Sequence, residues 1–165
     1  MDTPTVSLIL SALAVLIAIY AVFRKPETPP VPVAKPDSTP LRLQAYERLV
    51  LLTERISLPN LISRLNQPGI SAAEMKLILT ENIKQEFEYN STQQLYVSPM
   101  SWDAVRNLKE QNIMVINQVS GMLPLDASAA DLNKKILEVL MSQPGGSLHE
   151  MVLQALNFEA KKLMD

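Results

Sequence analysis

One histidine and a group of glutamates are the side chains best able to carry out chemistry in this chain. His149 is the only histidine, the chain has no cysteine, and no carboxylate pair lies beside it in the sequence. A lone histidine makes a poor metal or acid–base site, so we expect His149 on the surface, near the start of a capped helix. Glu81, Glu86 and Glu88 lack the Glu-x-x-His spacing of di-metal bundles and favour a solvated helix face. The sequence thus predicts no catalytic residue, no metal site, no cofactor and no enzyme activity.

Three further residues have types that can bind ligands or carry modifications. Asn90 begins an Asn-Ser-Thr triplet, the acceptor pattern for N-glycosylation. Such triplets are common by chance, and a cytoplasmic domain would not be glycosylated. Tyr96 and Trp102 flank the start of a long predicted helix, where core or rim positions are favoured over a ligand platform. Residues 41–165 hold 12 basic and 14 acidic residues without a basic run, and this excludes the usual nucleic-acid binders.

Asn112 interrupts an apolar stripe on that long helix. At about 100° per residue, Val105, Leu108, Ile116 and Val119 lie within about 80° of one another with Asn112 between them. A buried amide needs hydrogen-bond partners. Two interpretations of Asn112 remain open. We favour a polar core residue whose hydrogen bonds are satisfied, and the alternative is a contact that fixes the helix register, as in coiled coils.

The elements that position these residues are predicted to be helical throughout. Only four glycines occur, which suits helices. Ser71, Ser128 and Ser147 are each followed three residues later by an acid, the pattern of a capping box. We expect a connection over 90–97, extended at 95–97. The predicted helices cover 40–57, 59–65, 72–89, 99–122, 129–142 and 148–164. The fold class is therefore all-α, with a compact bundle of about six helices.

The first apolar segment is a candidate membrane anchor. Residues 6–23 carry no charge and would span about 27 Å as a helix. A signal peptide fits less well because no Lys or Arg precedes the segment and its one Ala-x-Ala pattern lies inside it; a buried core helix fits least. Arg24, Lys25 and Lys35 all follow the segment. By the positive-inside rule the N-terminus should lie outside and the C-terminal domain in the cytoplasm.

A proline-rich linker is expected after the anchor. Residues 25–40 contain six prolines, which favour an extended polyproline conformation with a reach of about 50 Å. A spacer is favoured over a ligand for a proline-binding groove. The predicted division is a tail over 1–5, a transmembrane helix over 6–23, a linker over 24–40 and a bundle over 41–165.

Small residues form a stripe along the anchor. They are spaced by four, three, four and three residues, which places them on one face of a helix within about 80°. In lipid, small residues allow two helix backbones to approach closely. We weigh a helix-packing face evenly against chance. The residues of this candidate face are Ser7, Ser11, Ala14, Ala18 and Ala21.

The chain resembles an uncharacterised bacterial family of small single-pass membrane-anchored helical proteins, a domain of unknown function. The resemblance rests on the stretches LRLQAYERLVLLTERIS and QEFEYNSTQQLYVSPMSWDAV and on the layout of anchor and linker. It implies the bacterial cytoplasmic membrane as the location and adds no site residues.

These features together favour an interaction protein. We expect a membrane-tethered helical scaffold, an accessory subunit of a membrane-associated assembly, whose partner is a protein or a second copy. The alternative is a membrane-anchored module that binds a peptide or lipid, suggested by eight methionines.

Overall fold

The computed structural model describes residues 2–23, 37–142 and 148–164. The chain divides into two units, Met1–Pro36 and Asp37–Asp165. The first contains one helix, α1 (Thr3–Phe23). Most of the predicted linker lies outside the described residues, and its last two residues already belong to the first helix of the second unit.

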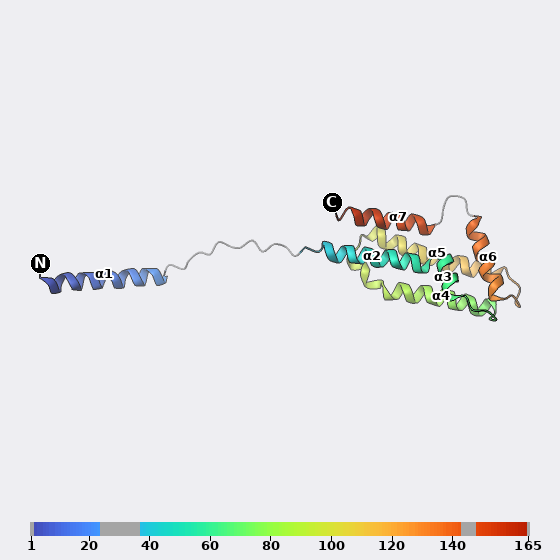
Figure 1. Cartoon of the computed structure of the whole chain (residues 1–165), viewed down its shortest axis with the longest axis horizontal. Coiled ribbons are helices and arrows are strands. Elements are labelled where there is room, and N and C mark those ends of the chain that lie inside the picture. The colour runs from blue at the N-terminus through green and yellow to red at the C-terminus, as the bar shows by residue number, and fades with distance from the viewer. Residues whose placement is uncertain (1, 24–36, 143–147, 165) are drawn as a thin grey trace. The chain divides into compact units, whose positions relative to one another are not determined.

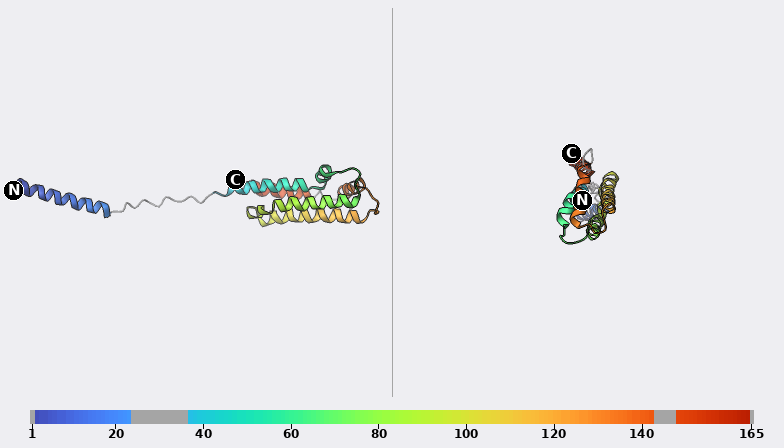
Figure 2. Two further views of the ribbon diagram at one scale, coloured as in Figure 1. Left: turned by 90° about the horizontal axis from the view of Figure 1, so that it is seen from below. Right: turned by 90° about the vertical axis from the view of Figure 1, so that its right-hand side faces the viewer.

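The second unit is a helical bundle (Figure 1). Its α-helices are α2 (Thr39–Ile56), α3 (Leu58–Leu65), α4 (Ala72–Tyr89), α5 (Pro99–Gly121), α6 (Ala129–Met141) and α7 (Leu148–Lys161). The four long helices α2, α4, α5 and α7 lie side by side along the bundle, and α6 crosses them at one end (Figures 1 and 2). The all-α prediction is confirmed, and no strand occurs among the described residues.

The predicted helix ends agree closely with the observed ones because local signals set them. Ser71 and Ser128 form complete capping boxes with Glu74 and Asp131. The third expected capping box begins at Ser147, which lies outside the described residues. Prolines occupy the first turns of α2, α3 and α5, where a missing backbone N–H is harmless.

The connection expected over 90–97 is present, but its last part was predicted wrongly. It contains a short 3₁₀ helix, η1 (Ser91–Leu95), and residues 95–97 are not extended. Backbone N–H groups of Gln93 and Tyr96 donate to carbonyls three residues back, at 3.0 Å each. These local bonds turn the chain tightly between α4 and α5.

The core is formed by the inward faces of all six helices. Its largest fully buried side chains include Tyr46, Leu49, Met75, Leu108 and Leu132. Leu41 and Leu148, in the first turns of α2 and α7, are exposed. Leu148 nevertheless lines a hollow together with Leu108 of α5 and Leu140 of α6.

Two helix starts are joined directly. The backbone N–H of Ala72 donates to the carbonyl of Ala127 at 2.9 Å, and that of Ala129 donates to Ile70 at 3.0 Å. This isolated antiparallel bridge pairs Ser71 with Ser128. The N-termini of α4 and α6 are therefore fixed against each other by backbone hydrogen bonds.

Candidate functional site

Of the three clustered glutamates of α4, Glu88 is exposed, as expected for a solvated face, while Glu81 and Glu86 form ion pairs. The side chain of Glu86 is only 14% exposed and pairs with Arg55 of α2 and Arg64 of α3. Hydrogen bonding by Arg55 is the main cause that lowers the pKa of Glu86. Glu81 pairs with Lys84 at 2.7 Å. In the described residues no group of three or more acidic or histidine side chains could hold a metal ion.

The arginines around Glu86 also complete the end of α2. The last carbonyls of a helix have no donor within the helix, and Pro59 removes one backbone N–H that could have served. Arg64 Nη2 donates to the Arg55 carbonyl at 3.2 Å. Ser57 Oγ and Asn60 Nδ2 donate to the Glu54 carbonyl at 3.0 and 3.1 Å. Side chains thus replace the missing backbone donors at the corner between α2 and α3.

Asn112 completes the same corner from α5. It is 6% exposed, and its Nδ2 donates to the carbonyl of Ile56, the last residue of α2, at 2.7 Å. The structure therefore places this amide in the core with a partner on another helix. A hydrogen bond from α5 to the end of α2 is the contact that a register role requires, and that role stays a prediction.

His149 lies near the start of α7, as expected, but it is half-buried. Its side chain is 22% exposed, and Nε2 lies 3.3 Å from Oε2 of Glu54 on α2. Nε2 is buried and has no aligned hydrogen-bond acceptor among the described residues, so the two atoms are close without a well-formed hydrogen bond. The expectation of a surface position was wrong because α7 packs along α2, which brings together two residues far apart in sequence.

A pocket opens beside His149. It has a volume of about 460 Å³ and lies among α2, α3, α5, α6 and α7. Leu108, Val115 and Leu140 contribute apolar walls, while Asn112 and His149 contribute polar groups. An apolar cleft with a few convergent polar groups is the usual form of a ligand site. Sequence analysis did not predict the pocket because its lining residues come from several separate helices.

The remaining residues with ligand-binding chemistry have structural contacts. Asn90 is buried, and its Nδ2 donates to the Glu86 carbonyl at 2.8 Å, so its amide is unavailable for glycosylation in the folded bundle. Trp102 is half-buried and its ring lies 4.9 Å from that of Phe87. Tyr96 is exposed. Trp102 therefore packs at the edge of the core, as expected.

The small residues of α1 are all exposed. Every member of the candidate face, from Ser7 to Ala21, is open to its surroundings. Ser11 Oγ donates to the Leu8 carbonyl at 3.0 Å, which satisfies its hydroxyl within the helix. A shallow hollow on α1 is lined by Ser11 together with Ala12, which does not belong to the predicted stripe. The structure thus leaves the packing role of the stripe as a prediction.

A second hollow lies on the bundle between α2 and α4. This groove has a volume of about 690 Å³, and Arg48, Leu51 and Arg55 of α2 line one side while Gln85 and Tyr89 of α4 line the other. Leu51 and Tyr89 are strongly exposed for apolar and aromatic residues. Sequence analysis missed the groove because its two sides come from separate helices.

Comparison with known proteins gives a family and no activity. No curated protein and no solved structure matches the chain. Residues 3–163, nearly the whole chain, match the model of a family of unknown function. The match spans both α1 and the bundle, so the two parts occur together in that family's model. The chain therefore belongs to the DUF7935 family, a family of unknown function.

Proposed function

We propose that the protein is a membrane-tethered helical interaction protein, an accessory subunit of a membrane-associated assembly, and that it is not an enzyme. The observation that carries the proposal is α1. Residues Pro4–Phe23 form a helix long and apolar enough to span a bilayer, and none of this window is buried in the fold. An uncovered apolar helix of this length needs lipid around it.

The proposed location is the bacterial cytoplasmic membrane, with the N-terminus outside and the bundle in the cytoplasm. The support is the position of Arg24, Lys25 and Lys35, which all follow the apolar segment. An uncleaved anchor fits better than a signal sequence, which would require a basic start and a cleavage site after the apolar run.

Fractionation and reporter fusions test the tether and its orientation. The full chain should stay in the membrane pellet after carbonate washing and run at its full-length mass. Alkaline phosphatase fused to the C-terminus should be inactive, and a cytoplasmic fluorescent reporter at the same site should be bright. A soluble, shortened product would contradict the tether, and an active phosphatase would contradict the orientation.

The candidate packing face of α1 has its own test. Replacing Ser11, Ala14 and Ala18 together by Leu should keep membrane insertion and abolish association in a membrane two-hybrid assay, because the larger side chains separate the backbones. The matched control replaces Leu8, Leu16 and Ile19 by Val and should leave association unchanged. Equal association of both variants and the parent would contradict the packing role.

A second candidate function rests on the pocket beside His149. We propose as the alternative that the bundle binds a peptide or a lipid there, since the pocket combines apolar walls with Asn112 and His149. The purified full chain should then gain thermal stability with a lysophospholipid or fatty acid. Leu148→Trp, which fills the mouth, should abolish that gain. Absence of any shift with the parent protein would contradict the lipid form of the alternative.

A further inference from the structure

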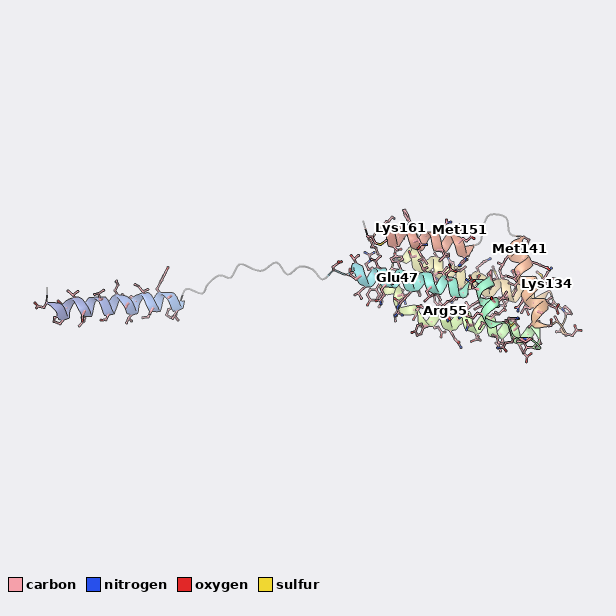
Figure 3. The ribbon with its side chains drawn as sticks, viewed as in Figure 1. Glu47, Arg55, Lys134, Met141, Met151 and Lys161 are labelled. Atoms are coloured by element: carbon pink, nitrogen blue, oxygen red, sulfur yellow. The ribbon has the colours of Figure 1, made fainter. Side chains whose placement is uncertain are left out.

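The outward face of α2 carries a charge pattern that repeats after seven residues. Glu47-Arg48 and Glu54-Arg55 are identical pairs, and Leu51 lies midway between them. Leu51 is 58% exposed, although most large apolar residues of α2 face the core. Glu47 and Arg48 are exposed and have no ion-pair or hydrogen-bond partner within the described residues. Figure 3 shows Glu47 and Arg55 projecting from α2.

Helix geometry separates these charges into two edges. At about 100° per residue, Glu47 and Glu54 lie about 40–60° to one side of Leu51, and Arg48 and Arg55 lie about 40–60° to the other. The exposed ridge of α2 therefore has an acidic edge, an apolar centre and a basic edge. The basic edge borders the groove between α2 and α4, where Tyr89 is also exposed.

We propose that this ridge binds the same ridge of a second copy of the chain, with the two α2 helices parallel. Consider a parallel pair related by a twofold axis that runs along the helices. The acidic edge of one α2 then faces the basic edge of the other at the same height along the axis. Each Glu47 then meets the partner copy's Arg48, and Leu51 packs on the same residue of the other copy. Glu54 and Arg55 keep their contacts with His149 and Glu86 within the chain and only add to the charge of the two edges. The same surface patch is used twice, as twofold symmetry requires.

The charge pattern also selects against the antiparallel arrangement. There, a twofold axis brings like edges together, so acid faces acid and base faces base, which is unfavourable. A parallel pair keeps both α2 N-termini on one side. This arrangement rests on the proposed function, because two anchors in one membrane favour it.

The ridge is small, and tethering compensates for its size. One leucine and a few ion pairs make a weak contact in solution, since exposed ion pairs contribute little. Confinement to a membrane raises the effective concentration of one copy around another, which strengthens weak contacts without adding new ones. Pairing is therefore expected in the membrane, where the experiments below measure it.

Single cysteines test the arrangement directly because the natural chain has none. The full chain carries Leu51→Cys, Gln44→Cys or, as a control on α5, Gln118→Cys, and isolated membranes are oxidised with copper phenanthroline. Gln44 is exposed and lies seven residues before Leu51, within about 20° of it on the helix. We expect disulfide-linked dimers from Leu51→Cys and Gln44→Cys and few from Gln118→Cys.

Each other outcome overturns the inference. Dimers from Leu51→Cys alone would indicate an antiparallel pair, in which the two Gln44 positions lie about 20 Å apart along the axis. Equal crosslinking at all three positions would indicate random collision. No crosslinking in membranes that retain the protein would refute pairing while leaving the tether intact, whereas loss of the protein from the membrane fraction would refute the proposed function itself.

A charge reversal adds a test of specificity. With Leu51→Cys as the reporter, Arg48→Glu should lower the dimer yield about tenfold. Glu47 of each copy then faces a glutamate at position 48 of the other copy, and the twofold symmetry repeats this repulsion. Adding Glu47→Arg to the same chain should restore the yield, since the two charges have only changed places. These residues make no other ion pair among the described residues, so the bundle should remain folded. Failure of the second change to restore the yield would contradict the pairing.

Discussion

Removal of the Asn112 side chain should destabilise the bundle, because it leaves the Ile56 carbonyl at the end of α2 without its hydrogen-bond donor. In Asn112→Ala, the Ile56 carbonyl loses a donor at 2.7 Å. That carbonyl belongs to a residue with no exposed surface, and a helix end offers it no other donor. A buried polar group left without its partner costs about 1–3 kcal/mol.

The neighbouring pocket moderates the expected loss. Asn112 lines the 460 Å³ pocket beside His149, so water can approach the space that the shortened side chain leaves and partly satisfy the carbonyl. We therefore expect a loss of about 2 kcal/mol in the free energy of unfolding. For a bundle of this size, that corresponds to a decrease of about 8 °C in Tm.

Thermal unfolding of the full chain in mild detergent, followed by circular dichroism, measures the effect. Asn107→Ala is the matched control, because Asn107 is exposed on the same helix and should change the stability by less than about 0.5 kcal/mol. Asn112→Asp should be at least as harmful as Asn112→Ala at neutral pH, where a carboxylate cannot donate a hydrogen bond. At acidic pH the protonated carboxyl can donate again, so part of the loss should be recovered.

Equal stability of Asn112→Ala and Asn107→Ala would refute the reasoning. It would mean that water satisfies the Ile56 carbonyl in the parent protein and that the Asn112 amide contributes nothing to the free energy of unfolding. A loss in Asn112→Ala without pH-dependent recovery in Asn112→Asp would assign the effect to packing instead of hydrogen bonding.

Three further predictions concern stability and use the same unfolding assay. Ser71→Ala should cost about 1 kcal/mol because it removes the cap of α4, whereas Ser71→Asp should retain most of the stability. Gly69→Ala should cost about 1 kcal/mol, since Gly69 has φ 85° and no steric neighbour, which leaves only the backbone strain. Glu86→Gln should remove an acid-sensitive contribution. Its ion pairs hold the pKa of Glu86 in the folded chain below the usual range of a glutamate, so the stabilisation is present above the unfolded pKa and is lost as the pH falls through the folded pKa. The parent should therefore lose more stability than Glu86→Gln below about pH 5, and parallel pH profiles would contradict this account.

Local signals explain why most helices could be predicted from the sequence. Ser71 and Ser128 with their acids, and the prolines of α3 and α5, set helix ends through contacts within four residues. The apolar period of α5 placed Asn112 on the inner face, because burial follows helix geometry even when the partner is unknown.

Contacts between distant residues explain what the sequence did not reveal. Glu54 approaches His149, and Glu86 binds Arg55, only because the helices pack in this order. No spacing rule links a residue on α2 to one on α7 or α4. The hollow between α2 and α4 was missed for the same reason, while η1 was missed because its short-range bonds have no apolar period to show them.

The corner between α2 and α3 has a consequence for the order of folding. Its final carbonyl is completed by a side chain 56 residues further along the chain, so that bond cannot form until α5 has docked. Contacts of such long range are made after local helices and their neighbours have assembled. The corner should therefore contribute little to the folding transition state, and weakening it should accelerate unfolding while leaving the folding rate nearly unchanged. Asn112 would then act on how long the bundle persists once folded, more than on how quickly it forms.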